Sequence, residues 1–122
     1  MEGITNRKEY IRNRKEYVEQ LINNTLEITD NHTANVINAF IILQSNNIKC
    51  KIVQGWKLNT QKIYNREAYI FIELYICSKR YFLDIRDKIH ISSSLNNGVF
   101  RKKPSEKYIA SKVKGTQYSS KN

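Results

Sequence analysis

Hydrophobic and polar positions along this chain follow two different periods. Apolar residues recur at helical spacing over residues 6–22 and again over 32–46. Residues 48–56 instead alternate between apolar and polar side chains, and residues 68–77 form a nearly continuous run of β-branched and aromatic residues. The pattern therefore predicts two helices followed by two strands, with the second strand at the centre of a sheet.

The first predicted helix carries an internal repeat. The sequence NRKEY occurs at 6–10 and again at 13–17, which stacks tyrosines and the apolar residues after them along one side. Asn6 followed by Glu9 resembles an N-cap with a capping box. Two heptads are too few to identify a coiled coil. We interpret the segment as an amphipathic helix that packs on its own domain or on a neighbour, with RNA contact through its basic residues as the alternative.

Shorter elements complete the prediction. TLEIT at 25–29 is expected to be a short strand, and Asp30 or Asn31 then offers an N-cap for the helix at 32–46. Residues 78–91 place apolar side chains at helical spacing after Ser78, which predicts a third helix. Two last strands are expected at 99–100 and 107–113, after a loop at 92–98.

The order of these elements indicates the fold class. After the N-terminal helix they run β-α-β-β-α-β, which predicts an α+β, two-layer α/β sandwich with helices on one face of a mostly antiparallel sheet. The chain of 122 residues has the usual length of one domain. The expected organisation is an amphipathic helix extension at 1–23, one α/β domain at 24–113 and a basic, polar tail at 114–122.

Net charge points to the class of partner. The chain holds 21 Lys and Arg against 11 Asp and Glu, a net charge of +10. Residues 62–122 contribute +8 of that total, and the last 25 residues alone contribute +6. A basic surface concentrated in one part of a chain is the electrostatic footprint of phosphate binding, so we expect a nucleic acid as the partner. Solubility and an AT-rich coding sequence are the alternative origins of this charge.

Other functional classes lack the residues they need. No apolar stretch is long enough for a transmembrane helix, and the first residues have no apolar core of a secretory signal. Cys50 and Cys77 fall in or at the end of predicted strands as small hydrophobes, and His32 and His90 add too few ligands for a metal site. The chain has no P-loop and no GxGxxG. We therefore expect no enzyme activity, no cofactor, no small-molecule substrate and no membrane partner.

The order of several motifs is similar to that of a known family. TLEIT at 25–29, FIILQSNNIKC at 40–50, SKRY at 78–81 and PSEKYIA at 104–110 follow one another at its spacing. Over these positions the chain resembles the eukaryote-specific L-twenty-two family of large-subunit ribosomal proteins, whose members open with a TLDCT-like strand and enter a basic helix through SKRY. The resemblance implies a β-α-β-β-α-β sandwich and a structural, rRNA-bound place in the 60S subunit beside neighbouring ribosomal proteins. It also implies a cytoplasmic location, with a nucleolar stage during assembly.

The resemblance also implies which residues contact rRNA. It assigns Lys79, Arg80 and Lys88 to RNA contacts, and their helical neighbourhood adds Arg86. Basic residues interleaved with aromatic ones suit phosphate contact and base stacking, and the C-terminal segment has this mixture. That segment adds four candidates: Arg101, Lys102, Lys103 and Lys107.

A second resemblance supports an alternative function. IKCKIVQGW, IFIELYI and RYFLD are similar to successive strands of a transglutaminase-like core. In that alignment Tyr69 stands where the catalytic His belongs, only Asp84 of the catalytic residues survives, and no Cys stands at the helix start. The alternative is therefore a catalytically dead transglutaminase-like fold that acts as a protein-interaction scaffold.

Overall fold

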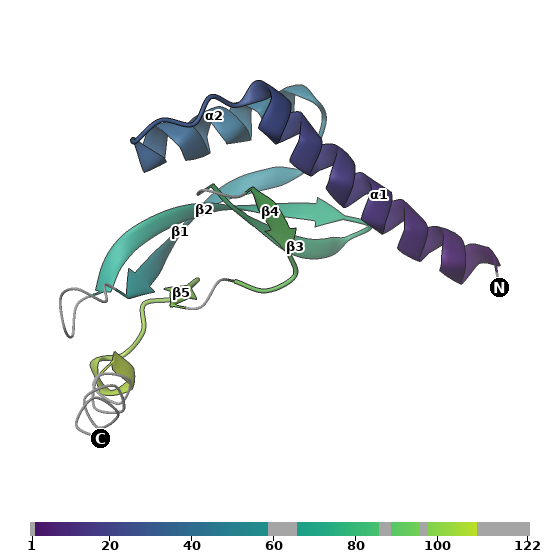
Figure 1. Ribbon diagram of the computed structural model, residues 1–122. Coiled ribbons are helices and arrows are strands. Elements are labelled where there is room, and N and C mark those ends of the chain that lie inside the picture. The colour runs from purple at the N-terminus through teal and green to yellow at the C-terminus, as the bar shows by residue number, and fades with distance from the viewer. Residues whose placement is uncertain (1, 59–65, 86–88, 96–97, 110–122) are drawn as a thin grey trace, which may run out of the picture. The chain divides into compact units, whose positions relative to one another are not determined.

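The computed structural model describes residues 2–58, 66–85, 89–95 and 98–109 (Figure 1). Helices α1 (Glu2–Thr25) and α2 (His32–Ser45) precede five strands. The strands form one antiparallel sheet in the order β4-β3-β2-β1-β5, which confirms the α+β class and the N-terminal helix. The strands are β1 (Cys50–Leu58), β2 (Arg66–Ile76), β3 (Lys79–Asp84), β4 (His90–Ser92) and β5 (Val99–Phe100).

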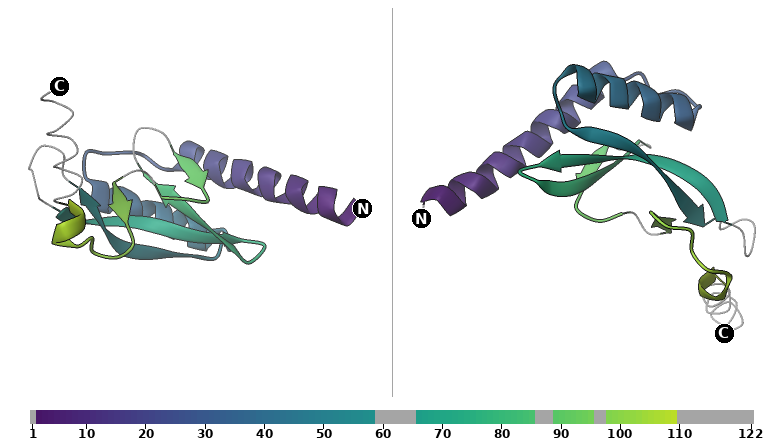
Figure 2. Two further views of the ribbon diagram at one scale, coloured as in Figure 1. Left: turned by 90° about the horizontal axis from the view of Figure 1, so that it is seen from below. Right: turned by 180° about the vertical axis from the view of Figure 1, so that it is seen from behind.

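The chain divides into two compact units. Unit 1 comprises residues 1–53 and 71–94, and unit 2 comprises residues 54–70 and 95–122, so that β1 and β2 each pass through both. In unit 1 the two helices lie on one side of the strands (Figures 1 and 2). The domain boundaries expected after residues 23 and 113 stay a prediction.

Helix α1 is longer than its periodicity predicted. It begins at Glu2, so Asn6 lies inside the helix and the predicted capping box at Asn6 is wrong. Val18 and Ile22 are fully buried, and α1 packs against α2 and β4. Its C-terminal half therefore packs on its own domain, as one of the two interpretations expected.

Helix α2 begins and ends where its sequence indicates. The Asn31 side chain accepts a hydrogen bond from the Ala34 amide at 3.0 Å, which confirms the predicted N-cap. Buried Val36, Ala39 and Leu43 form the apolar face that packs into unit 1. The burial of this face accounts for the stability of a helix that holds no Asp, Glu, Lys or Arg.

The strand predicted at 25–29 is wrong. Thr25 ends α1, and the next residues follow neither a helix nor a strand. The reason is Asn35, whose side-chain oxygen accepts from the Thr29 amide at 2.9 Å while its amide nitrogen donates to the Thr29 carbonyl at 2.8 Å. Because the Asn35 side chain hydrogen-bonds both the N–H and the C=O of Thr29, these backbone groups do not pair with a neighbouring strand.

The helix predicted at 78–91 is also wrong. Lys79–Asp84 is strand β3, paired with β2 through a two-residue turn at Cys77 and Ser78, whose φ angles of 52° and 65° are both left-handed. Leu83 faces Ile72 and Tyr81 faces Leu74 in this register. Tyr81, Leu83 and Ile85 also alternate, so the segment satisfied both periods, and pairing with the long apolar β2 selected the strand.

Near the C-terminus the structure agrees with the prediction in part. Val99–Phe100 is a strand, as expected, and Gly98 has the positive φ of a turn residue, 85°. Residues 106–109 form a helical turn in place of the strand expected to start at 107, with the Ser105 hydroxyl accepting from the Tyr108 amide at 3.1 Å. The remainder of that predicted strand and the tail at 114–122 lie outside the described residues.

Candidate nucleic-acid interface

The two cations of SKRY point to opposite faces of the sheet. Neighbouring positions of a strand alternate between its faces. Lys79 pairs with Ile76 in the register, and its Nζ lies 5.5 Å from the centroid of the Tyr81 ring. Arg80 pairs with Tyr75, and its guanidinium lies 5.3 Å from the centroid of the Phe82 ring. The basic helix that would have grouped these residues is replaced by a strand that separates them.

We call the two sides of β2 and β3 the helix face and the Glu73 face. The helix face carries Leu74, Tyr81 and Leu83, and Lys15 of α1 lies over its Tyr81 ring, 4.6 Å from the centroid. The Glu73 face carries Glu73 and Phe82, which pair with each other across the two strands. Lys79 belongs to the helix face and Arg80 to the Glu73 face.

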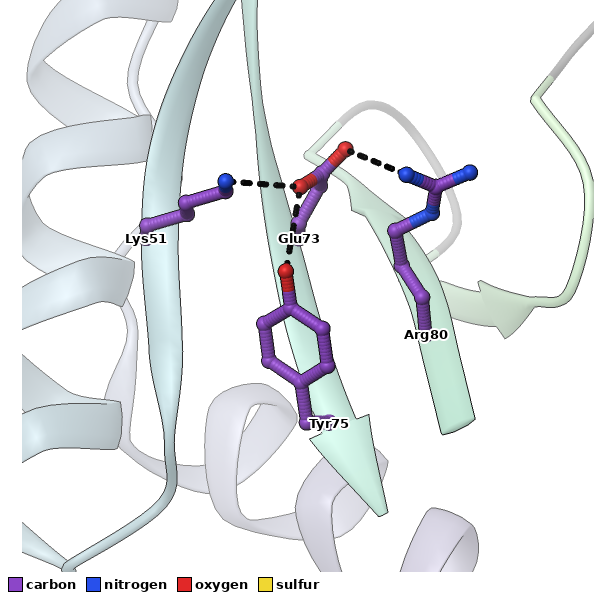
Figure 3. A network of polar contacts seen from close by, with 4 residues as sticks. All are labelled: Lys51, Glu73, Tyr75 and Arg80. Atoms are coloured by element: carbon purple, nitrogen blue, oxygen red, sulfur yellow. Dashed lines mark hydrogen bonds and ion pairs between the residues drawn. The ribbon is translucent and has the colours of Figure 1, made fainter. Parts of the chain in front are cut away.

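A buried carboxylate organises the Glu73 face (Figure 3). The Glu73 side chain has no exposed surface. Its Oε2 lies 3.5 Å from Lys51 Nζ and accepts a hydrogen bond from the Tyr75 hydroxyl at 3.5 Å. Its Oε1 lies 3.9 Å from Arg80 Nη1. The network thus brings a cation from β1 and a cation from β3 to a single carboxylate on β2.

The exposure of these groups determines what the network can do. The side chains of Lys51 and Arg80 are 55% and 45% exposed, so both cations also face water. Half-exposed ion pairs contribute little to stability by themselves, but a carboxylate without exposed surface needs cations beside it. Lys49 adds a third cation, 5.4 Å from the centroid of the Tyr75 ring. The Glu73 face therefore presents two cations at the carboxylate and a third at the neighbouring Tyr75 ring, a net positive surface whose N–H groups can meet phosphate oxygens.

Unit 2 carries its own cations beside aromatic rings. Lys103 Nζ lies 5.0 Å from the Trp56 ring centroid, and Lys57 Nζ lies 5.4 Å from that of Tyr69. Phe100 and Tyr108 stack edge to face at 5.5 Å. Cations and rings presented together are what phosphate contact and base stacking require.

The predicted RNA-binding residues are exposed wherever the structure describes them. In unit 1 these are Lys79 and Arg80. Arg86 and Lys88 lie outside the described residues. In unit 2 they are Arg101, Lys102 and Lys103, which follow β5, and Lys107, which lies on the helical turn.

Sequence reasoning missed the centre of the Glu73 face. Glu73 is the only charged residue in the run 68–77, and a lone charge in a buried strand requires a partner of opposite charge. The sequence therefore indicates that Glu73 has a cationic partner, but it does not identify which residue that partner is. Lys51 becomes the partner only through its place on the neighbouring strand β1.

The other residues that could take part in catalysis or metal binding lie in surroundings that do not favour either role. His90 Nδ1 lies 3.3 Å from Glu19 Oε2, which also accepts a hydrogen bond from the Ile91 amide at 2.8 Å. Burial raises the pKa of the Cys50 thiol, which disfavours the thiolate that a nucleophile needs. Among the described residues, no three His, Cys, Asp or Glu side chains gather where they could hold a metal ion. None of the described helices combines the length and the apolar character that crossing a bilayer requires.

Comparisons with protein-family models, with curated proteins and with solved structures find no match for this chain. The family resemblance over residues 25–110 therefore stays a prediction that rests on its motifs alone. Two of those motifs, TLEIT and SKRY, adopt structures other than the strand and the helix that the resemblance implies.

Proposed function

We propose that this protein is a structural rRNA-binding component of the large (60S) ribosomal subunit and has no catalytic role. The observation that carries the proposal is the set of exposed cations beside aromatic rings, present in both units: Lys79 at Tyr81, Arg80 at Phe82 and Lys103 at Trp56. RNA offers phosphates to these cations. Tyr81 and Phe82 are buried and serve only to hold their cations, whereas the partly exposed Trp56 can also meet a base face. The motif order that resembles the ribosomal family directs the proposal to rRNA.

The distribution of charge supports an RNA partner. Unit 2 holds ten basic and two acidic residues, whereas unit 1 holds eleven basic and nine acidic residues. Unit 2 therefore has a net charge of +8, whereas the cations of unit 1 are nearly balanced by its acidic residues and leave a net charge of +2. A patch of high charge gives affinity for the RNA backbone irrespective of sequence, and ordered cations give orientation.

The proposal is tested on the native protein in its own cell extract. Sucrose-gradient sedimentation should place the protein with the 60S particle, and washing with increasing salt should release it steeply, because each neutralised phosphate frees counterions. Sedimentation as a free protein at moderate salt contradicts the proposal. Sedimentation in a complex with proteins only favours the inactive transglutaminase-like scaffold instead.

Site residues are tested in the purified full chain with a short RNA duplex. Replacing Lys79, Arg80 and Lys88 together with Ala should weaken binding equally for different RNA sequences, and should lower the slope of log affinity against log salt by about one unit per lost contact. An unchanged slope would exclude these residues from the RNA interface.

A further inference from the structure

Two lysines from distant parts of unit 1 share one tyrosine ring. Lys15 Nζ of α1 and Lys79 Nζ of β3 lie 4.6 Å and 5.5 Å from the centroid of Tyr81, whose side chain is only 2% exposed. These distances keep the two ammonium groups within about 10 Å of each other, close to the screening length of physiological salt. The ring attracts each cation, but it does not neutralise either of them.

No described carboxylate balances this pair. Within the residues that the structure describes, neither Lys15 nor Lys79 forms an ion pair. Of the acidic residues of α1 whose side chains the structure describes, Glu19 lies 3.3 Å from His90 and Glu9 lies 4.0 Å from Arg12, while Glu16 forms an ion pair with neither lysine. Two like charges thus lie near each other, and no described carboxylate comes within 4.0 Å of either ammonium group.

A third cation reaches the same hairpin. Arg7 of α1 donates from Nη2 to the carbonyl of Cys77 at 3.4 Å, at the turn that leads directly into Lys79. Its side chain is exposed, and a guanidinium that spends one N–H on a carbonyl keeps four others. Helix α1 and the β2–β3 hairpin therefore present three cations to the same region of unit 1.

We infer that Arg7, Lys15 and Lys79 form a phosphate-binding site between α1 and the β2–β3 hairpin, and that its ligand is a backbone phosphodiester of RNA. This inference rests on the proposed function and adds α1 to the RNA-binding surface. A phosphodiester supplies an anion that can pair directly with both lysines, since its two free oxygens can accept hydrogen bonds from two ammonium groups at once. The side chains come from two elements distant in sequence, so the site exists only in the folded protein.

The test measures binding of a short mixed-sequence RNA duplex to the full chain. The variants are Lys15→Gln, Lys79→Gln and the double variant. Arg12→Gln is the matched control, because it removes one positive charge from the same helix at a side chain that is 67% exposed and paired with Glu9. Each Lys variant should lower affinity about fivefold and the salt slope by about 0.9, whereas the control should leave affinity within about twofold.

The double variant tests whether the two lysines share a ligand. If they contact the same phosphodiester, the double variant loses clearly less affinity than the product of the two single losses. A Lys15→Gln variant that binds as the Arg12→Gln control does would overturn the inference while leaving the proposed function intact. Failure of the unmodified chain to bind RNA would overturn both.

A footprint gives a readout that needs no variant. RNA should protect the amines of Lys15 and Lys79 from acetylation by a water-soluble acetyl ester, as measured by peptide mass spectrometry. Equal acetylation of both lysines with and without bound RNA would overturn the inference. Protection by polyglutamate but not by RNA would identify an acidic peptide as the ligand and would also overturn it.

Discussion

Glu73 is the residue on which its face of the sheet depends. It has no exposed surface, yet the cations beside it, Lys51 and Arg80, are half exposed. A charge that cannot reach water is retained only where opposite charges compensate it, so this carboxylate and its two cations act as a unit. The same contacts hold the cations over the sheet in place for a partner.

Removing both cations should therefore destabilise the protein. We expect the Lys51→Met and Arg80→Met double variant to lose about 3 kcal/mol of unfolding free energy, because the buried carboxylate loses the two cations that lie beside it. Urea denaturation followed by circular dichroism measures this loss.

Glu73→Gln provides the control for that experiment. Added to the double variant, it should restore most of the lost stability, since a neutral amide of nearly the same size replaces the uncompensated charge. A double variant that unfolds within about 0.5 kcal/mol of the original protein would show that Glu73 does not rely on these cations.

At the scale of the elements, the β2–β3 hairpin has a turn whose backbone angles its two residues rarely adopt. Both of its central residues, Cys77 and Ser78, have positive φ angles. Such turns strongly favour Asn-Gly, because a side chain at a left-handed position costs free energy that glycine avoids. The turn connects the two strands that carry Glu73 and Arg80, so its geometry also positions the candidate interface.

A sequence better suited to this turn should stabilise the protein. We expect Cys77→Asn combined with Ser78→Gly to raise the unfolding free energy by about 1 kcal/mol without changing the pairing of the strands. Ser78→Val is the opposing control, since a β-branched residue at that φ should lower stability by a similar amount or more. Loss of stability in the Asn-Gly variant would contradict the turn as the structure has it.

The sequence predicted those elements whose signals are local. Helix α2 has its cap, its apolar spacing and its terminating asparagines within one stretch, so its bounds were predicted almost to the residue. The segment at 25–29 failed because a buried amide on α2, Asn35, takes the backbone groups of Thr29. The segment at 78–91 failed because its apolar residues fit two periods, and only pairing with β2 distinguishes them.

The residues of the candidate site divide in the same way into those with local and those with long-range signals. The exposure of the basic residues could be predicted from residue type alone, because charged side chains are rarely buried. The separation of Lys79 from Arg80, and the meeting of Lys15 with Tyr81, depend on which element each residue occupies and what packs beside it. Contacts between segments distant in sequence leave no periodic signal in either segment.

In the whole molecule, net charge is divided unequally between the units. Unit 2 has a net charge of +8 from ten basic and two acidic residues, and Arg101, Lys102 and Lys103 form its densest cluster. The single tryptophan of the chain, Trp56, lies beside that cluster through Lys103. Its fluorescence should therefore report RNA binding to unit 2.

We expect replacement of Arg101, Lys102 and Lys103 with Gln to lower the salt slope of RNA binding by up to about 2.7, because each contact contributes about 0.9. Stability should change by less than about 0.5 kcal/mol, since all three side chains are exposed. Titration with an RNA duplex at several salt concentrations, followed by Trp56 fluorescence, measures the slope. An unchanged slope would assign the phosphate contacts elsewhere in the chain.

The two-residue turn at Cys77 and Ser78 determines which face of the sheet each side chain of β3 lies on. With a turn of this length, Lys79 lies on the helix face beside Tyr81, and Arg80 lies on the Glu73 face. Inserting or deleting one residue in the turn would exchange the two cations between the faces and turn the apolar side chains of β3 outward. A substitution within the hairpin changes one side chain on one face, whereas a change in the length of the turn would remove the core pairing and both cation sites in one step.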